Sequence, residues 1–168
     1  NTAVGYLALS TNLTGDYNTA VGYQALRYNT GNSNTALGYY ALRDNTSGTN
    51  NTAAGVRCLT NNTNGSQNSG MGYECLAANT TGASNSAMGH LAMELNTTGS
   101  FNVAFGKEAL NANNGSFNTA AGIYAANGIT SGQYNSALGY SALPSTTTAN
   151  NNTAGGYFAG IGGNYTNI

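Results

Sequence analysis

Residues 18–26 read Asn-Thr-Ala-Val-Gly-Tyr-Gln-Ala-Leu, and residues 34–42 read Asn-Thr-Ala-Leu-Gly-Tyr-Tyr-Ala-Leu. This pattern recurs along the whole chain as eight coils of 17 residues and two of 16, which accounts for all 168 residues. A repeat of this kind indicates a solenoid, so residues 1–168 are predicted to form one repetitive unit without a linker. The coils begin at Asn1, Asn18, Asn34, Asn51, Asn68, Asn85, Asn102, Asn118, Asn135 and Asn152.

Two of the 17 positions of the coil, here called columns, do not vary: column 1 is always Asn and column 5 is always Gly. A Gly fixed at one position predicts a positive φ or a close approach of backbone. We expect both columns to form structural ladders along the solenoid. The glycines are Gly5, Gly22, Gly38, Gly55, Gly72, Gly89, Gly106, Gly122, Gly139 and Gly156.

The other columns predict how each coil is built. Columns 3 and 8 hold almost only Ala, which indicates a crowded interior, whereas columns 4 and 9 are apolar and vary in size. Column 7 follows no rule and is expected to face solvent. A coil of 17 residues is too short for the two packed helices of a helical repeat, so the prediction is an all-β, parallel β-solenoid of the β-roll type. Each coil is expected to hold strands at columns 2–4 and 6–9, a turn at the column 5 Gly, and a loop over columns 10–17.

A second Asn ladder is predicted in the loop. Column 12 is Asn in the first seven coils, and Asn side chains stacked one per coil can hydrogen-bond along the axis. Its members are Asn12, Asn29, Asn45, Asn62, Asn79, Asn96 and Asn113.

The apolar columns also predict self-association. Columns 3 and 4 are adjacent in a strand and therefore point to opposite faces, yet both are apolar. One of these faces fills the coil, and the other needs a cover. The most economical cover is a parallel copy of the same chain. The sequence leaves open which of the two columns faces inward.

The composition excludes several classes of function. Charged residues make up 5% of the chain, the formal net charge is −1, and there is a single His. This leaves no basic surface for nucleic acid. The carboxylates are scattered; Glu74 and Glu108 share column 7 two coils apart, at about 10 Å, and are interpreted as solvated side chains. No nucleophile, base and orienting group can be assembled, so we predict neither an enzyme nor a cofactor or metal site. No apolar run approaches the ~18 residues of a membrane span.

Two cysteines, Cys58 and Cys75, occupy column 8 of adjacent coils. They are either a disulfide or two buried thiols of about the size of Ala. Side chains on parallel, in-register strands point the same way, which is unfavourable for disulfide geometry and favours free thiols.

Three further sets of residues allow a functional or a purely structural interpretation. Column 6 carries tyrosines that could contact glycans or simply stack: Tyr6, Tyr23, Tyr39, Tyr73, Tyr140 and Tyr157. Column 2 is a file of Thr and Ser interrupted by Val103; an ice-binding array would need a second regular file, and the loop threonines are expected to keep no constant phase. Sequons make a glycoprotein possible at Asn12, Asn45, Asn50, Asn61, Asn64, Asn79, Asn96, Asn114, Asn151 and Asn164.

The repeats at residues 18–26 and 34–42, each followed by a variant of Asn-Thr-Thr-Gly, resemble the repeats of phage tail-fibre-like and bacterial surface fibre proteins. More distantly, the pattern is similar to the head repeats of trimeric autotransporter adhesins. That resemblance implies a left-handed β-roll in a parallel homotrimer.

The expected function is a structural fibre or shaft that spaces an adhesive or receptor-binding tip from a virion or a cell. The expected location is extracellular, at the cell surface or on the virion. Since the chain begins at Asn1 without a Met or a signal segment, we expect it to be a fragment of a longer fibre. The alternatives are a multivalent glycan-binding adhesin surface and, ranked last, an ice-binding β-solenoid. The expected partners are copies of the chain itself and, in the adhesin alternative, cell-surface glycans.

Overall fold

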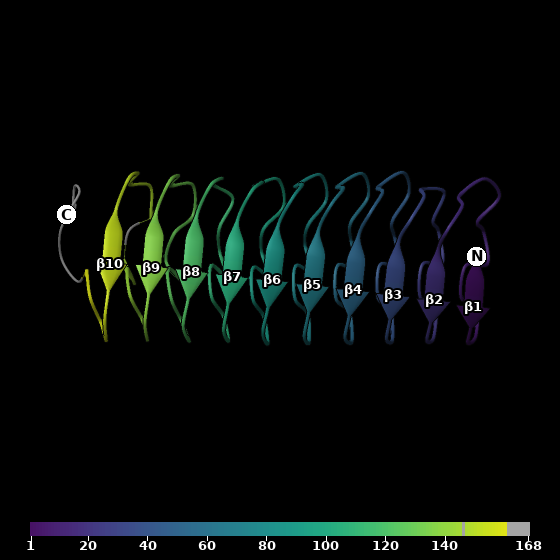
Figure 1. Cartoon of the computed structure of the whole chain (residues 1–168), viewed down its shortest axis with the longest axis horizontal. Helices are drawn as coiled ribbons and strands as arrows, with labels where there is room; N and C mark the ends of the chain where they lie inside the picture. The colour runs from purple at the N-terminus through teal and green to yellow at the C-terminus, as the bar shows by residue number, and fades with distance from the viewer. Residues whose placement is uncertain (146, 161–168) are drawn as a thin grey trace.

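The computed structural model describes residues 1–145 and 147–160, and this part of the chain is an all-β solenoid without a helix (Figure 1). Each coil contributes one strand to a single ten-stranded parallel sheet, which confirms the predicted fold class. The strands are β1 (Thr2–Val4), β2 (Thr19–Val21), β3 (Thr35–Leu37), β4 (Thr52–Ala54), β5 (Ser69–Met71), β6 (Ser86–Met88), β7 (Val103–Phe105), β8 (Thr119–Ala121), β9 (Ser136–Leu138) and β10 (Thr153–Gly155).

The strands follow one another in chain order, and every neighbouring pair is in register, with column 3 facing column 3. The register also holds across a 16-residue coil, where Ala20 pairs with Ala36. The missing residue lies in the loop, at column 14, and Gly31 of this short coil still lies against Gly15 of the coil before it. The sheet therefore runs straight from one end to the other (Figure 1).

Alternation along the strand decides which column faces inward. Column 3 is buried, with Ala20, Ala36 and Ala53 all fully inaccessible, whereas columns 2 and 4 point outward. The core consists mainly of columns 3, 8 and 9, that is, of Ala, two Cys, Leu and one Met. The apolar column that the sequence leaves without a cover is thus column 4.

The predicted second strand at columns 6–9 is wrong. Columns 7 and 9 have positive φ, for example 54° at Gln24 and 49° at Leu26, a region that a strand does not enter. The backbone instead makes overlapping turns, in which column 10 donates to column 7 and column 12 to column 9. These turns bring the chain back toward its start. Hydrogen bonds between coils continue here, as from the Gln24 amide to the Tyr6 carbonyl at 2.8 Å, which explains the strand-like sequence pattern.

The expectation that column 7 faces solvent is also wrong for most coils. Gln24 and Ser141 are only 7% exposed, and most other members are half-buried. The turn lays these side chains along the coil, where they contact columns 6 and 10: the Gln24 amide oxygen accepts from Arg27 at 3.0 Å. The side chains of column 7 vary because their contacts lie at the surface of the coil. Most of these side chains nevertheless lie along the coil and do not extend into water.

The column 5 glycines behave as predicted. Gly22 has φ 139°, and a Cβ at this position would overlap the backbone of Gly38 in the next coil. Both the positive φ and the close approach therefore require Gly.

Candidate functional site

The column 1 asparagines hold each coil to its own loop and to the next coil. Asn34 is fully buried; its Oδ1 accepts from the backbone N–H of Asn51 at 2.9 Å, and its Nδ2 donates to the carbonyl of Gly48 at 2.9 Å. The Oδ1 contact to the following column 1 amide recurs down to Asn152. A buried amide is tolerated here because both of its ends are paired.

The column 12 asparagines form a second, inner ladder. Nδ2 of Asn62 donates to Oδ1 of Asn45 at 2.7 Å and to the loop carbonyl of Gly65 at 2.9 Å. The stacked-amide contact is weakest at its start, at 3.4 Å between Asn29 and Asn12, and it ends at Asn96, whose Oδ1 is buried without a partner. The next coil is a short one, so the loop geometry changes at that step. Both ladders are structural and present no reactive group to solvent.

Aromatic, basic and acidic side chains gather on one surface, over the turns of coils 2 to 4. We call it the tyrosine–arginine surface; its members are Tyr23, Gln24, Arg27, Tyr39, Tyr40, Arg43, Asp44 and Arg57. Three of the four basic residues of the chain lie here. The turn that joins column 7 to column 10 brings Gln24 to Arg27 and Tyr40 to Arg43. Sequence reasoning missed this surface, although the spacing of three residues in two consecutive coils was a usable signal.

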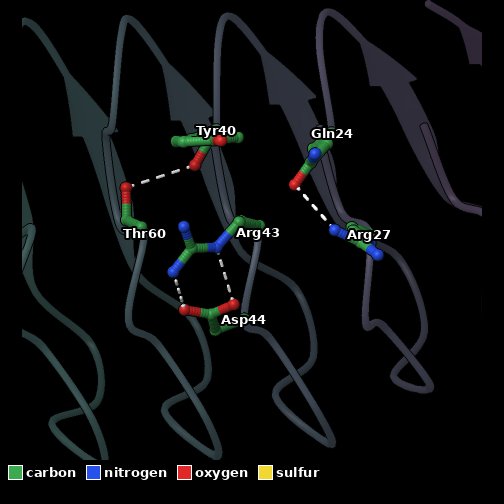
Figure 2. Close-up of polar contacts among 6 residues, drawn as sticks. All are labelled: Gln24, Arg27, Tyr40, Arg43, Asp44 and Thr60. Atoms are coloured by element: carbon green, nitrogen blue, oxygen red, sulfur yellow. Dashed lines mark hydrogen bonds and ion pairs between the residues drawn. The ribbon is translucent and has the colours of Figure 1, made fainter. Parts of the chain in front are cut away.

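Polar contacts fix the arginines of this surface (Figure 2). Arg43 and Asp44 make two parallel contacts of 2.8 and 2.5 Å, and these hydrogen bonds raise the pKa of the Arg43 guanidinium. The Arg43 guanidinium also lies 4.8 Å from the centre of the Tyr40 ring. Arg57 pairs with Glu74 of the next coil at 3.1 Å. The hydroxyl of Thr60 donates to the Tyr40 backbone carbonyl at 3.2 Å.

The tyrosine rings of column 6 stack face to face. Tyr23 stacks between Tyr6 and Tyr39, with ring centres 5.2 and 5.1 Å apart. The ring centre of Tyr40 lies 4.0 Å from that of Tyr39, and a hydrogen-bonding contact between the two side chains raises the pKa of Tyr39. A ligand approaching this stack from the side meets ring edges and hydroxyl groups, while the faces that sugars prefer are covered within the stack.

The other column 6 tyrosines form shorter stacks. Tyr73 stacks on His90 at 5.3 Å, and Tyr140 stacks on Tyr157 at 5.3 Å. A further aromatic stack, which sequence reasoning missed, is formed by the last residues of coils 6 to 8, Phe101, Phe117 and Tyr134. The centres of successive rings are 5.0 Å apart, and the rings are nearly parallel. Three aromatic residues at the same phase of consecutive coils were the signal for it.

The two column 7 carboxylates are not brought together. Glu74 belongs to the ion pair with Arg57, and Glu108 lies 3.5 Å from Lys107. The residues that the structure describes contain no group of three His, Cys, Asp or Glu side chains suited to a metal ion.

Cys58 and Cys75 are free and fully buried in the core. A side-chain hydrogen bond with Cys75, together with burial, raises the pKa of the Cys58 thiol well above its ordinary value. A Cβ at Gly70 would lie 2.6 Å from the Cys58 sulfur. The one Gly of column 3 therefore makes room for the larger atom in column 8 of the preceding coil.

Burial separates the ten sequons into two groups. Asn45, Asn79 and Asn96 are fully buried in the column 12 ladder, and Asn12 at its start is half-buried. Asn164 lies outside the described residues. The exposed sequon asparagines are Asn50, Asn61, Asn64, Asn114 and Asn151.

The loop threonines do keep a constant phase, contrary to the sequence expectation. Column 13 forms a file in which the hydroxyl of Thr30 donates to the Thr46 carbonyl at 2.7 Å, and that of Thr46 to the Thr63 carbonyl at 2.8 Å. These hydroxyl protons are used within the protein. The column 2 file faces outward but shares its face with the large apolar side chains of column 4.

Comparisons of the chain with protein-family models, with curated proteins and with solved structures find no match. Within residues 1–145 and 147–160, no helix has the length and apolar character needed to cross a bilayer.

Proposed function

We propose that the chain is a structural shaft, a segment of an extracellular or virion-attached fibre that holds an adhesive or receptor-binding tip away from its base. One observation carries this proposal: a single hydrogen-bonded sheet and the column 1 ladder run in register through ten coils. With strands about 4.8 Å apart, the ten coils extend over roughly 43 Å. Repetition of one unit along one axis produces length and stiffness, which are the properties of a spacer.

The distribution of polar groups supports the same proposal. The column 1 amides are bonded at every step between coils, and the column 12 amides at each step from coil 1 to coil 6, so bending the rod would break several hydrogen bonds at once. The charged side chains lie on the turns and loops, several of them in ion pairs with a residue of the same or the next coil.

A distance measurement between the ends of the rod tests the spacer function. Thr14 and Thr148 are exposed at column 14 of coils 1 and 9, eight coils apart, and dyes attached through Thr14→Cys and Thr148→Cys should lie about 38 Å apart. Labelled chains are diluted into unlabelled protein so that transfer occurs only within a chain. A single narrow distance supports a rigid shaft, and a broad or much shorter distribution contradicts it. Antibody labelling of intact virions or cells then tests the location.

A second candidate function, glycan binding, is favoured by the tyrosine–arginine surface, which offers tyrosine hydroxyls and guanidinium groups at the repeat spacing. Because the ring faces are covered, each contact would be weak, and useful affinity would come from several copies acting together. A glycan array probed at high protein density tests this candidate. Binding that disappears with Arg57→Ala but persists with Lys107→Ala would support it, and no binding by folded protein would remove it.

A further inference from the structure

Arg27 is the one Lys or Arg side chain that has no acidic partner in the part of the chain that the structure describes. The chain has four such residues, and each of the other three lies within 3.5 Å of a carboxylate oxygen. The three pairs are Arg43–Asp44, Arg57–Glu74 and Lys107–Glu108. One positive charge of the tyrosine–arginine surface is therefore left uncompensated, and it is located at Arg27.

The guanidinium of Arg27 is nevertheless positioned by its neighbours. Its Nη1 donates to the Gln24 Oε1 at 3.0 Å (Figure 2), and its Cζ lies 4.8 Å from the centre of the Tyr28 ring. Its Nε is buried and has no hydrogen-bond partner within residues 1–145 and 147–160. A buried N–H of a charged group is unfavourable without an acceptor, so an acceptor bound at this edge of Arg27 would be stabilising.

The next coil shows what such an acceptor looks like (Figure 2). Arg43 occupies column 10, as Arg27 does, and its Nε and Nη2 donate to the two carboxylate oxygens of Asp44 at 2.8 and 2.5 Å. Asp44 stands in column 11, where coil 2 has Tyr28. The backbone is equivalent in both coils, because the amides of Tyr28 and Asp44 each donate to the column 10 carbonyl of the following coil at 3.0 Å. The Asp44 carboxylate therefore models a ligand that the same edge of Arg27 lacks.

Tyr28 allows a ligand to reach this edge. It is 41% exposed, and its side chain makes no hydrogen bond and no aromatic stack with the residues that the structure describes. Exposed side chains change rotamer within nanoseconds. A carboxylate from solvent first meets Nη2 of Arg27, and it gains Nε when the Tyr28 ring turns aside. The guanidinium then makes the two parallel contacts that Arg favours with carboxylates.

The surroundings of Arg27 favour an acidic sugar over an acidic peptide. One unpaired cation compensates one anionic group, whereas a run of acidic residues would bring further carboxylates close to Asp44 and Glu74. A uronic acid carries a single carboxylate on a ring whose other substituents are uncharged. Its C–H face can pack on the exposed ring of Tyr28. A longer glycan bound at Arg27 can also reach Arg57, which lies two coils further along the axis, about 10 Å away.

We propose that Arg27 and Tyr28 form a binding site for the carboxylate of an acidic sugar, in which Nε and Nη2 of Arg27 donate to its two oxygens as Arg43 donates to Asp44. This inference deepens the second candidate function, glycan binding, because it names the class of sugar and the residue that anchors it, and it rests on that function. A single contact of this kind is weak, so affinity for a long glycan comes from several sites acting together.

NMR titration with a disaccharide of one uronic acid and one neutral sugar tests the site. The control ligand is the same disaccharide with its carboxyl group reduced to an alcohol. The wild-type chain should bind the acidic form at least about 10-fold more tightly, which is the ratio expected for hydrogen bonds to a charged group. The Nε–H signal of Arg27 should shift on binding, because this proton gains an acceptor.

Substitutions at column 11 separate the site from a general effect of charge. Tyr28→Asp reproduces in coil 2 the ion pair of coil 3 and should abolish binding of the acidic disaccharide. Tyr28→Asn removes the same ring without adding a carboxylate and should retain binding. Asp44→Ala exposes the equivalent edge of Arg43 and should raise the number of sites per chain from one to two. Column 11 already holds Ala78 in coil 5, and circular dichroism checks that all three variants fold.

Three results would overturn the inference: equal affinity for the acidic and the reduced disaccharide, equal binding by the two Tyr28 variants, or equally tight binding of N-acetylglutamate amide, which has a carboxylate but no sugar ring. The first result would leave glycan binding in place with an uncharged ligand. Folded protein that binds no sugar at all would remove glycan binding and this site together. The proposed shaft is independent of both, since the end-to-end distance tests it separately.

Discussion

The column 1 ladder leads to a quantitative prediction at Asn68, which is fully buried in coil 5. Its Oδ1 accepts from the backbone N–H of Asn85 at 3.0 Å, and its Nδ2 donates to the carbonyl of Gly82 at 2.8 Å. Asn68→Ala leaves the Asn85 N–H buried without a partner, which costs about 1–3 kcal/mol. The Gly82 carbonyl keeps a bond from Asn79, so its loss is smaller. With the small cavity added, we expect a loss of about 3 kcal/mol in the free energy of unfolding.

Asn64→Ala is the matched control. Asn64 is exposed, and its Oδ1 accepts only from the hydroxyls of Thr46 and Ser47. The same chemical change should cost less than about 1 kcal/mol there. Urea unfolding followed by circular dichroism measures both variants at one protein concentration, so that the two free energies of unfolding are directly comparable. Equal losses for the two variants would refute the argument that the column 1 amides stabilise the coil stack.

Asn68→Asp extends the test to pH. The substitution keeps the acceptor for Asn85 but places a carboxylate oxygen against the Gly82 carbonyl, where only a protonated oxygen can donate. Burial and this contact should raise the pKa of the introduced carboxyl in the folded state above its unfolded value of about 3.9. The native state then binds more protons than the unfolded state between the two pKa values, so stability falls as pH rises through that range. A variant whose stability relative to wild type does not change with pH would contradict this geometry.

Three further substitutions test other columns. Gly22→Ala should cost more than about 3 kcal/mol in thermal or urea unfolding because the new Cβ overlaps backbone at positive φ, whereas Gly155→Ala, where a Cβ meets open space, should have little effect. Gly70→Ala should be destabilising alone but nearly neutral together with Cys58→Ala, and a double-mutant cycle that shows simple additivity would contradict the proposed contact. Ser33→Gly, at φ 59°, should raise the unfolding midpoint by the equivalent of about 0.5–1 kcal/mol, while the same exchange within a strand should lower it.

The repeat predicted the architecture because its constant columns report constraints between neighbouring coils. The stacking distance allows only Gly at column 5 and only Ala or Gly at column 3, so the sequence alone shows where these positions lie in the coil. The sequence could not show which of columns 3 and 4 faces the core, because Ala20 and Val21 are both apolar. Only the side of the strand toward which the chain turns back to close the coil distinguishes the two columns. The structure supplies that direction.

The second strand was predicted wrongly for a physical reason. Ala8 and Leu9 follow Tyr6 and Leu7 in an order typical of a strand, but Leu7 and Leu9 adopt φ of 54° and 51°. A positive φ costs about 1 kcal/mol for a non-Gly residue, so propensity argues against it. The hydrogen bonds to adjacent coils outweigh that local preference, and a single sequence gives no signal of such tertiary contacts.

The candidate surfaces were partly predictable for a related reason. Column 6 was visible as a Tyr file, but the contacts of Arg27 with Gln24 and of Arg43 with Tyr40 depend on the turn that replaced the expected strand. A wrong local structure at columns 6–9 therefore hid the tyrosine–arginine surface.

The distribution of variable columns separates two roles on opposite parts of the coil. Columns 1, 3, 5 and 8 are constrained by the coils above and below, whereas column 4 on the outward face of the sheet and the turns and loops vary more freely. Column 4 varies in size, from Gly155 to Phe105, and never carries charge, whereas the turns and loops hold all nine charged residues. A surface exposed to water throughout would have no reason to exclude charge from one of its variable columns. The exclusion of charge from column 4 is therefore a constraint of a different kind from the contacts between coils that fix columns 1, 3, 5 and 8.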